Sequence, residues 1–379
     1  MPDWTEEQQA LREGLAQWCG QFNERHQERD KTGRFDPVAW KAVRASGILG
    51  LPFEERWGGL GQDLLTTMYV FEELGRGCRD GGLSFSVATQ VVSAGIPLQR
   101  FGSEALKERY LPDICEGEAI TGHAISEPDS GSDALAMRTR AVRDGDHWII
   151  DGSKTFVTNA PIADVITVYA RTGRNDGPLG ITAFLVERDT PGLTVGQPLE
   201  KMGLKSSPTA ELFFDGCSVP AANVIGAPGS GFLVMDHVMK WEILLSFVIN
   251  VGEMQHRLER CMEYAKQRKQ FGKPIGSFQS VANRLVEMKI GADTSRMWLY
   301  RTARKLQNKQ DVVTDIAISK LLTSEANLSS ALAAVQLFGG AGYMTETGVE
   351  KDLRDAVGGT IYSGTSDIQR NRIASVLGL

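Results

Sequence analysis

Residues 240–279 read KWEILLSFVINVGEMQHRLERCMEYAKQRKQFGKPIGSFQ, and this unbroken stretch predicts one long helix that ends near Gly272 and Pro274. Between residues 241 and 252 nearly every side chain is apolar, and Glu242 is the one ionisable group. A carboxylate in apolar surroundings loses hydration, so we expect the pKa of Glu242 to be raised. Glu242 is therefore a candidate proton acceptor. The structural alternative is an ion pair with a cation elsewhere in the fold.

The second half of the same stretch is amphipathic and basic. Lys266, Arg268 and Lys269 precede Phe271, a composition that favours contact with an anionic ligand or an acidic partner helix. The alternative is ordinary packing at an interface between helices.

Composition excludes several classes of protein. The chain has 379 residues, which predicts two or three domains at about 150 residues per domain. With 42% apolar residues, 23% charged residues and a net charge of -6, it is typical of a soluble globular protein and not of a general nucleic-acid binder. The longest apolar stretches fall short of the ~18 residues that a membrane-spanning helix needs, and the polar N-terminus does not resemble a signal peptide.

The cysteines indicate a reducing compartment. Their number is odd, they lie far apart, and none forms a CxxC pair, so a disulfide framework is not expected. We expect buried thiols in a cytoplasmic protein without a membrane segment.

Hydrophobic periodicity divides the chain into three parts. Residues 1–118 show helical spacing and predict an N-terminal helical domain. Residues 119–225 contain short β-branched and aromatic segments between turns, which predict a small antiparallel β domain. Residues 226–379 begin with a glycine-rich hinge and continue as helices joined by short connections, which favours an up-and-down bundle.

Motifs of several enzyme classes are missing from the sequence. The histidines are isolated, no HxxxH or HExxH occurs, and no cysteine pair has the spacing of metal ligands, so we expect no metal site. No GxSxG turn of a serine hydrolase is present. The glycines at 339–342 follow a helical pattern rather than a strand, which argues against a nicotinamide or nucleoside-triphosphate site.

One loop in the predicted β domain, ISEPDSGSD at residues 125–133, combines hydroxyls, a glycine and backbone NH groups. Such a surface can hold a phosphate or the polar edge of a heterocycle. The alternative is an ordinary turn.

This loop is the first of a series of motifs whose order and spacing resemble the acyl-CoA dehydrogenase family over nearly the whole chain. The others are LPFEERWGGLGQD at 51–63, DGSKTFVTN at 151–159, YAKQRKQFGKPI at 264–275, VQLFGGAGY at 335–343, RDA at 354–356 and IYSGTSDIQ at 361–369. The resemblance implies a mainly α fold with a helical N-terminal domain, a β-barrel-like middle domain and a C-terminal four-helix bundle. It also implies a homotetramer or homodimer with FAD held between the β domain and the bundle.

The resemblance assigns the cofactor site residue by residue. The residues expected to line the flavin and the thioester side of the cleft are His123, Ile125, Ser126, Gly131 and Ser132. Phe156 and Thr158 are expected to flank the isoalloxazine, with the Thr158 hydroxyl near flavin N5. The positions expected to meet the FAD of a neighbouring subunit are Arg268, Phe271, Gln279, Gln336 and Gly340. Thr365 and Asp367 are expected beside the ribityl and adenosine parts.

The implied reaction removes a proton from Cα and a hydride from Cβ of an acyl thioester, so it needs a carboxylate as base. Most family members place a glutamate in a Tyr-Glu-Gly-Thr motif, where this chain has Ser363. In a branch typified by isovaleryl-CoA dehydrogenase and dehydrogenases of prolyl carrier proteins, the base lies on the bundle helix, and counting back from Gly252 and Gln255 places it at Glu242. An arginine follows the base there, but Ile243 follows it here. We therefore expect Glu242 to be more basic and less firmly held.

Three hypotheses follow for the activity. The first is FAD-dependent α,β-dehydrogenation of an acyl thioester, on CoA or on a carrier protein, in secondary metabolism, with a separate acceptor that reoxidises the flavin. The second is a flavin-dependent monooxygenase or oxidase on the same fold, which needs no α-proton base. The third is a scaffold that has lost its catalytic activity. Bleaching of the flavin by an acyl thioester would support the first hypothesis. Reduction of the flavin by NAD(P)H would support the second, and absence of FAD from the purified protein would support the third.

Overall fold

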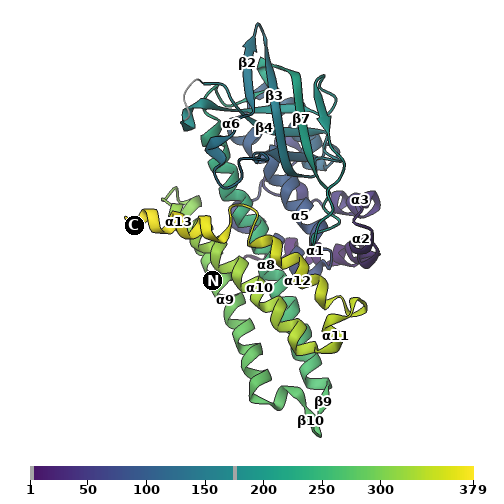
Figure 1. The fold of residues 1–379 in the computed structure, drawn as a ribbon. Helices are drawn as coiled ribbons and strands as arrows, with labels where there is room; N and C mark the ends of the chain where they lie inside the picture. Colours follow the sequence, from purple (N-terminus) through teal and green to yellow (C-terminus); the bar gives the residue numbers. More distant parts are fainter. Residues whose placement is uncertain (1–3, 174–176) are drawn as a thin grey trace.

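The computed structural model describes residues 4–173 and 177–379 of the chain. Figure 1 shows a β domain at one end of the molecule and a long helical bundle at the other, with the N-terminal helices packed against the bundle. The predicted order of helices, sheet and helices is confirmed. The first strand begins at Thr121 and the long bundle helix at Gly231, and we keep the division after residues 118 and 225 as a proposal.

Side-chain caps mark the starts of several N-terminal helices. Thr5, Asp36, Asp63, Asp80 and Ser103 each accept a hydrogen bond from a backbone NH in the first turn, which satisfies a donor that the helix itself leaves unpaired. The helices of this region are α1 (Glu6–Asn23), α2 (His26–Thr32), α3 (Pro37–Ala45), α4 (Leu64–Gly77), α5 (Gly81–Gln90), α6 (Ile96–Phe101) and α7 (Glu104–Glu116).

A π-helical turn at Val91–Gly95 joins α5 to α6 into one continuous helical run. This run, Gly81–Phe101, has a mean hydropathy of 1.2 and is long enough to cross a membrane, contrary to the expectation that no apolar stretch reaches that length. In the structure, 94% of its most apolar window is buried. Such burial is typical of a helix in the core of a folded domain.

The β domain is built on one mixed sheet. Its strands are β1 (Thr121–Ala124), β2 (Arg140–Asp144), β3 (His147–Thr158), β4 (Val165–Arg171), β5 (Ile181–Glu187), β6 (Leu193–Val195), β7 (Thr209–Pro220) and β8 (Val224–Ile225). The order across the sheet is β6-β7-β3-β2-β4-β5-β8, and β1 pairs with β4. The prediction of an antiparallel sheet was wrong for β1 and β2, which run parallel to β4. Parallel pairing needs a crossover, and the chain between β1 and β4 supplies one.

Strand β4 is the boundary between two hydrophobic cores. Ile166 and Val168 point into the core of the β domain, whereas Val165 and Tyr169 pack in the core that the helices form. Because side chains alternate along a strand, every second residue of this part of the sheet faces the helices. This alternation decides which side chains reach the bundle.

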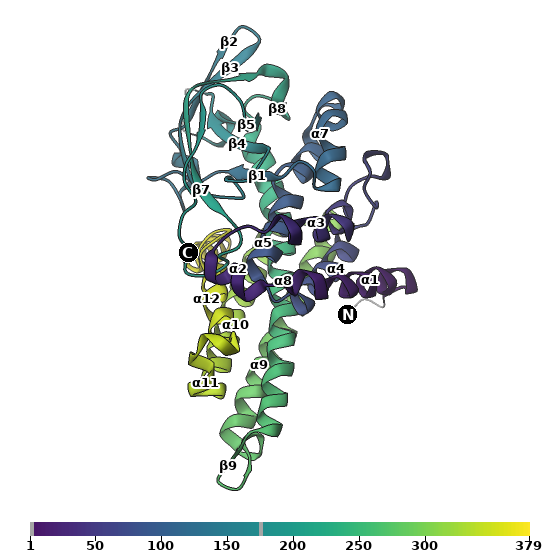
Figure 2. The ribbon, with the colours of Figure 1, turned by 90° about the vertical axis from the view of Figure 1, so that its right-hand side faces the viewer.

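The C-terminal part is helical except for one hairpin. Its elements are α8 (Gly231–Gln267), β9 (Lys269–Gln270), β10 (Lys273–Pro274), α9 (Gln279–Gln307), α10 (Val313–Phe338), α11 (Gly340–Tyr343), α12 (Val349–Gly359) and α13 (Ser366–Val376). The long helix begins at Gly231, directly after the predicted glycine-rich hinge, but its predicted end near Gly272 and Pro274 was wrong, because the helix stops where Arg268 adopts extended backbone angles. Helices α11 and α12 were not predicted. Figure 2 shows the β9–β10 hairpin at the end of the bundle farthest from the sheet.

Helices α4 and α8 cross at a pair of glycines. A Cβ on Gly252 would lie 2.0 Å from the carbonyl oxygen of Glu72, and one on Gly75 would lie 2.0 Å from that of Ile249. We expect Gly252→Ala to lower the free energy of unfolding by about 1–3 kcal/mol, because the helices must separate to admit the methyl group. Urea unfolding measures this change.

Gly14→Ala is the matched control for this prediction. Gly14 also lies within a helix, α1, but a Cβ there would meet no atom within 4 Å. This substitution should be neutral or should stabilise the protein by up to about 1 kcal/mol, since alanine favours the helix. Equal stability of the two variants would contradict the close crossing.

Candidate active site

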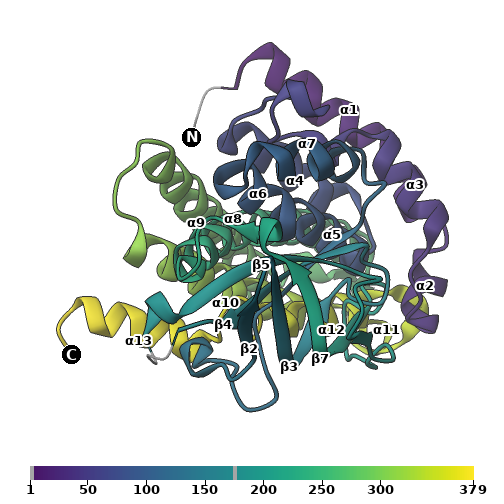
Figure 3. The same cartoon turned by 90° about the horizontal axis from the view of Figure 1, so that it is seen from above.

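Glu242 lies on α8 where the sheet, the bundle and the C-terminal turn meet, and it is only 9% exposed. The Ser363 hydroxyl donates a hydrogen bond to its Oε1. His123 Nε2 lies 3.0 Å from its Oε2, an ion-pair distance, although the alignment is poor for a hydrogen bond. Seen from above, the strands lie over the bundle, and β5 packs on α8 (Figure 3). Three distant parts of the chain thus meet at one carboxylate.

The pKa of Glu242 is shifted in the direction opposite to the one predicted. Burial favours the neutral acid, but the attraction of His123 and the hydrogen bonding around the carboxylate outweigh it and hold the pKa below its ordinary value. The expectation that Glu242 is loosely held was also wrong, because both of its oxygens have neighbours. Ile243, at the position of the expected arginine, is fully buried in the helical core. The partner that Glu242 finds elsewhere in the fold is His123, whose Nε2 lies at ion-pair distance.

The strand alternation explains why His123 reaches α8. His123 pairs with Thr167 in the parallel register of β1 and β4. Its neighbour Ala124 points into the core of the β domain, so His123 points to the opposite face, where α8 lies. A Cβ on Gly122 would lie 2.9 Å from the carbonyl oxygen of Thr158, so the glycine allows β1 to approach β3 closely.

The turn that carries Ser363 is held in a strained conformation. Ser363 has a φ of 56°, which is uncommon for a residue other than glycine, and Gly364 follows with a φ of 88°. Gln369 donates hydrogen bonds from its side-chain amide to the carbonyl oxygens of both residues. The ring of Tyr362 packs between Phe85 and Phe247. These contacts fix the hydroxyl of Ser363 against Glu242.

A buried ion pair supports the loop at residues 125–133. Lys154 is fully buried and donates hydrogen bonds to Glu127 Oε1 at 2.8 Å and to the carbonyl oxygen of Ile125 at 3.0 Å. Glu127 also accepts hydrogen bonds from the backbone NH groups of Arg138 and Thr139. Burial lowers the pKa of Lys154 to about 8, although Glu127 favours its charged form. No local pattern of residues predicted this pair, which supports the backbone of the loop that carries the expected cofactor residues Ile125 and Ser126.

The end of β3 offers an exposed aromatic side chain beside this loop. Phe156 is 71% exposed and has a φ of 56°, at a β-bulge where the pairing with β7 shifts between Lys154 and Val157. An exposed aromatic side chain on a strained backbone needs a reason, and a planar ring system packed on it supplies one. Gly131 adds open space, because a Cβ there would meet no atom within 4 Å. Together with Thr158 at the end of β3, these residues fit an isoalloxazine.

The other expected cofactor residues lie away from Glu242. Arg268 follows α8, roughly 40 Å from Glu242 along a helix that rises about 1.5 Å per residue. Phe271, at the tip of the hairpin, is 92% exposed. Gln279 begins α9, Gln336 lies near the end of α10, and Gly340 begins α11. Arg268 and Phe271 thus lie at the end of the bundle farthest from the sheet (Figure 2).

The remaining candidates lie in the loop at 125–133 and at the start of α13. Ser132 follows Gly131 in the loop at 125–133, and Thr365 caps α13, where it accepts a hydrogen bond from Ile368 NH. Asp367 lies exposed in the first turn of that helix. Thr365 and Asp367 come directly after the turn that carries Ser363, at the start of α13.

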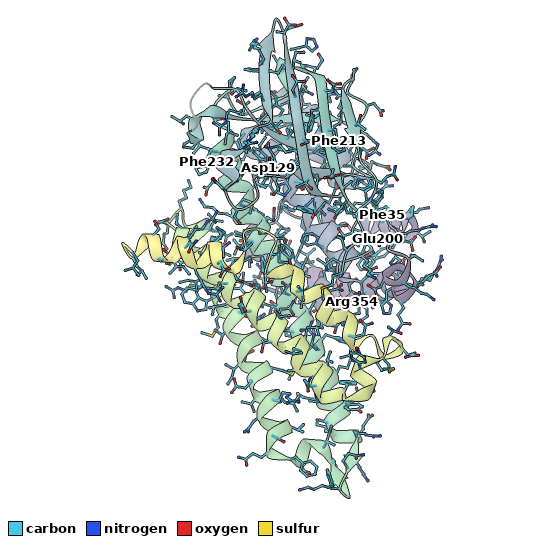
Figure 4. The ribbon with its side chains drawn as sticks, in the orientation of Figure 1. Phe35, Asp129, Glu200, Phe213, Phe232 and Arg354 are labelled. Carbon is cyan, nitrogen blue, oxygen red and sulfur yellow. The ribbon has the colours of Figure 1, made fainter. Side chains whose placement is uncertain are left out.

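The RDA motif forms a joint between parts of the chain rather than part of the cleft. Arg354, which is labelled in Figure 4, lies on α12. It pairs with Asp30 of α2 at 2.6 Å and donates a hydrogen bond to the carbonyl oxygen of Met202 at 3.0 Å. Asp355 accepts a hydrogen bond from Leu204 NH at 2.6 Å. The motif therefore ties the bundle to the N-terminal helices and to the connection between β6 and β7.

Thiols and metal ligands add nothing to the site. All five cysteines are buried and free. Among residues 4–173 and 177–379, no three His, Cys, Asp or Glu side chains are grouped as metal ligands.

The whole chain matches three consecutive family models. The acyl-CoA dehydrogenase N-terminal domain matches residues 5–118, the middle domain matches residues 122–217, and the C-terminal domain matches residues 229–378. The chain therefore belongs to the acyl-CoA dehydrogenase family, and the predicted fold is confirmed. It is an FAD-dependent oxidoreductase that acts on an acyl thioester.

Several similar proteins have names that describe a more specific activity. An L-prolyl-[peptidyl-carrier protein] dehydrogenase of a Serratia species is 43% identical over 90% of this chain and 88% of its own length. The crystal structure of the prolyl acyl carrier protein oxidase AnaB superposes with a TM-score of 0.97 at 40% identity, covering 100% of both chains. A structure of PigA with FAD and proline also gives a TM-score of 0.97, at 39% identity and 100% coverage of both chains.

Proposed function

We propose that the chain dehydrogenates a prolyl or closely related aminoacyl group held as a thioester on a carrier protein, with Glu242 as the base. The observation that carries this proposal is the buried Glu242 carboxylate, held between His123 and Ser363 with its pKa below the ordinary value. No glutamate is needed at position 363, because α8 already supplies the carboxylate. The similarity to prolyl carrier-protein dehydrogenases supports the choice of acyl group.

Each group has a defined task in this proposal. The thioester acidifies the Cα proton, and Glu242 accepts that proton. FAD, when bound, accepts the hydride from Cβ of the substrate. Ser363 holds the carboxylate in one rotamer through its hydrogen bond to Oε1. Burial between the sheet and the bundle excludes water, which strengthens the attraction between the carboxylate and its neighbours.

We further propose which residues hold the flavin. Phe156 and Thr158 would hold the isoalloxazine together with the loop from His123 to Ser132, and Thr365 and Asp367 would hold the remainder of FAD. Arg268, Phe271, Gln279, Gln336 and Gly340 would complete the site of another subunit in a homotetramer or homodimer. The exposure of Phe271 and its distance from Glu242 support this assignment. The buried free cysteines support a location in the cytoplasm.

The test is anaerobic incubation of the FAD-loaded protein with a panel of thioesters. The panel contains L-prolyl carrier protein, other aminoacyl carrier proteins, L-prolyl-CoA and straight-chain acyl-CoA esters. We expect L-prolyl carrier protein to bleach the flavin fastest and to lose two hydrogens per reduced flavin by mass spectrometry. Bleaching by straight-chain acyl-CoA alone would refute the aminoacyl substrate. Reduction by NAD(P)H followed by oxygen transfer would establish the monooxygenase alternative.

A further inference from the structure

We propose that His123 is the positioning residue for Glu242, supplying from strand β1 the favourable charge that an arginine next to the base supplies in the resembling branch. This inference rests on the proposed function, in which Glu242 accepts the Cα proton. His123 does not touch the Cα proton in this scheme. It acts through Glu242 by fixing one carboxylate oxygen and favouring the ionised form.

The geometry of the pair limits how the imidazole can act. Nε2 of His123 lies 3.0 Å from Oε2 of Glu242, and the two side chains are 14% and 11% exposed. A hydrogen on Nε2 is needed for a favourable contact with a carboxylate. The other ring nitrogen, Nδ1, is buried without a hydrogen-bond partner among the described residues. The contact with Glu242 is therefore the polar contact that orients the ring.

The groups that face Glu242 from the other elements do not replace His123. Tyr169 of β4 and Tyr362 of the C-terminal turn both interact with Glu242, and burial raises the pKa of each phenol well above its ordinary value. Both phenols therefore remain neutral in the physiological range. Ser363 donates one neutral hydrogen bond to the other oxygen. Among the described residues, His123 exerts the largest attraction on the carboxylate.

The consequence concerns the lower end of the pH range in which the base works. A base with a depressed pKa stays ionised to lower pH, so activity falls only when the pH passes below that pKa. Without the imidazole, the burial that opposes ionisation is countered by Ser363 alone, and the pKa rises. The acid limb, which is the part of the pH profile where activity falls as the pH is lowered, then lies at a higher pH. Each unit of this displacement lowers the rate about tenfold at a fixed pH on the acid limb.

The test compares the pH dependence of kcat/KM for His123→Gln with that of the wild-type holoenzyme, using L-prolyl carrier protein. Glutamine keeps an amide donor but cannot carry a positive charge. We expect the acid limb to move to higher pH by about one unit or more, kcat to fall on that limb, and KM to change little. The profiles are measured at saturating FAD, so that a change in FAD affinity does not enter the comparison. A purely structural role would lower the melting temperature without moving the limb.

Two further variants keep the test decisive. His123→Lys restores a positive charge and should return the acid limb toward its wild-type position, even if the protein is less stable. His256→Gln replaces a half-buried histidine on α8 that lies more than three turns from Glu242, and should leave the limb unchanged. An unmoved limb in His123→Gln, or no return in His123→Lys, overturns the inference. Retained bleaching in Glu242→Gln would instead overturn the proposed function, so the two failures are distinct.

Discussion

Glu242→Gln is expected to give a folded, FAD-containing protein whose flavin is reduced by substrate roughly 100- to 10,000-fold more slowly than in the wild type. The amide has the shape of the carboxyl group and can still accept the hydrogen bond from Ser363. It cannot accept a proton, so the substrate should bind without losing its Cα hydrogen. Stopped-flow measurement of flavin bleaching under anaerobic conditions determines the rate, and exchange of the Cα proton with deuterated solvent provides a second readout.

Glu253→Gln is the matched control on the same helix. Glu253 is a half-buried carboxyl group of α8, but desolvation raises its pKa, and its side chain accepts hydrogen bonds from Asn250 and Asn327. An amide is a close substitute for a carboxyl group that is easily protonated, so bleaching should proceed at the wild-type rate. If both variants bleach equally fast, Glu242 has no part in the chemistry.

Lys154→Met is expected to lower the free energy of unfolding by about 3–5 kcal/mol, the largest effect on stability that we expect from a single side chain here. The substitution leaves Glu127 buried with its two backbone donors but without its counter-charge. It also removes the hydrogen bond to the carbonyl oxygen of Ile125, so the loop beside Phe156 should hold FAD less tightly. Urea unfolding of the apoprotein and titration with FAD measure the two effects separately.

Lys289→Met removes the lysine of an exposed pair and serves as the control. Lys289 and Asp293 lie one turn apart on α9, with about half of each side chain exposed. Solvent screens such a pair, so the change should stay within about 1 kcal/mol. Equal losses in the two variants would show that burial of Lys154 contributes nothing to stability.

Local signals were sufficient to predict most of the fold. The aspartate before Pro37 and Ser103 before Glu104 are local signals of the starts of α3 and α7, because capping depends on neighbouring residues. The strands β4 and β5 were predicted from their β-branched and apolar residues. The parallel pairing of β1 was missed, because it depends on which distant strand lies beside it. The end of α8 at Gln267 was placed too late, because the residues that follow it pair as the β9–β10 hairpin.

The candidate site shows the same division. Motif spacing located Glu242 as a candidate base, but the sign of its pKa shift was predicted wrongly, because neither His123 nor Ser363 is near it in the sequence. Ser363 was regarded only as a lost carboxylate, whereas it donates a hydrogen bond to the carboxylate on α8. The pair of Lys154 and Glu127 was missed for the same reason. Contacts between distant residues depend on strand register and helix packing, which periodicity does not report.

The assembly of the Glu242 environment has a consequence for how activity arises during folding. Its three groups come from the middle domain, the bundle and the C-terminal turn, so none of these parts holds a complete site alone. Contacts between residues so far apart in the chain form late, since the intervening loops must close first. Recovery of activity after dilution from denaturant should therefore lag behind recovery of helical circular dichroism. The rate at which activity returns would thus measure the last step of folding, in which these parts dock.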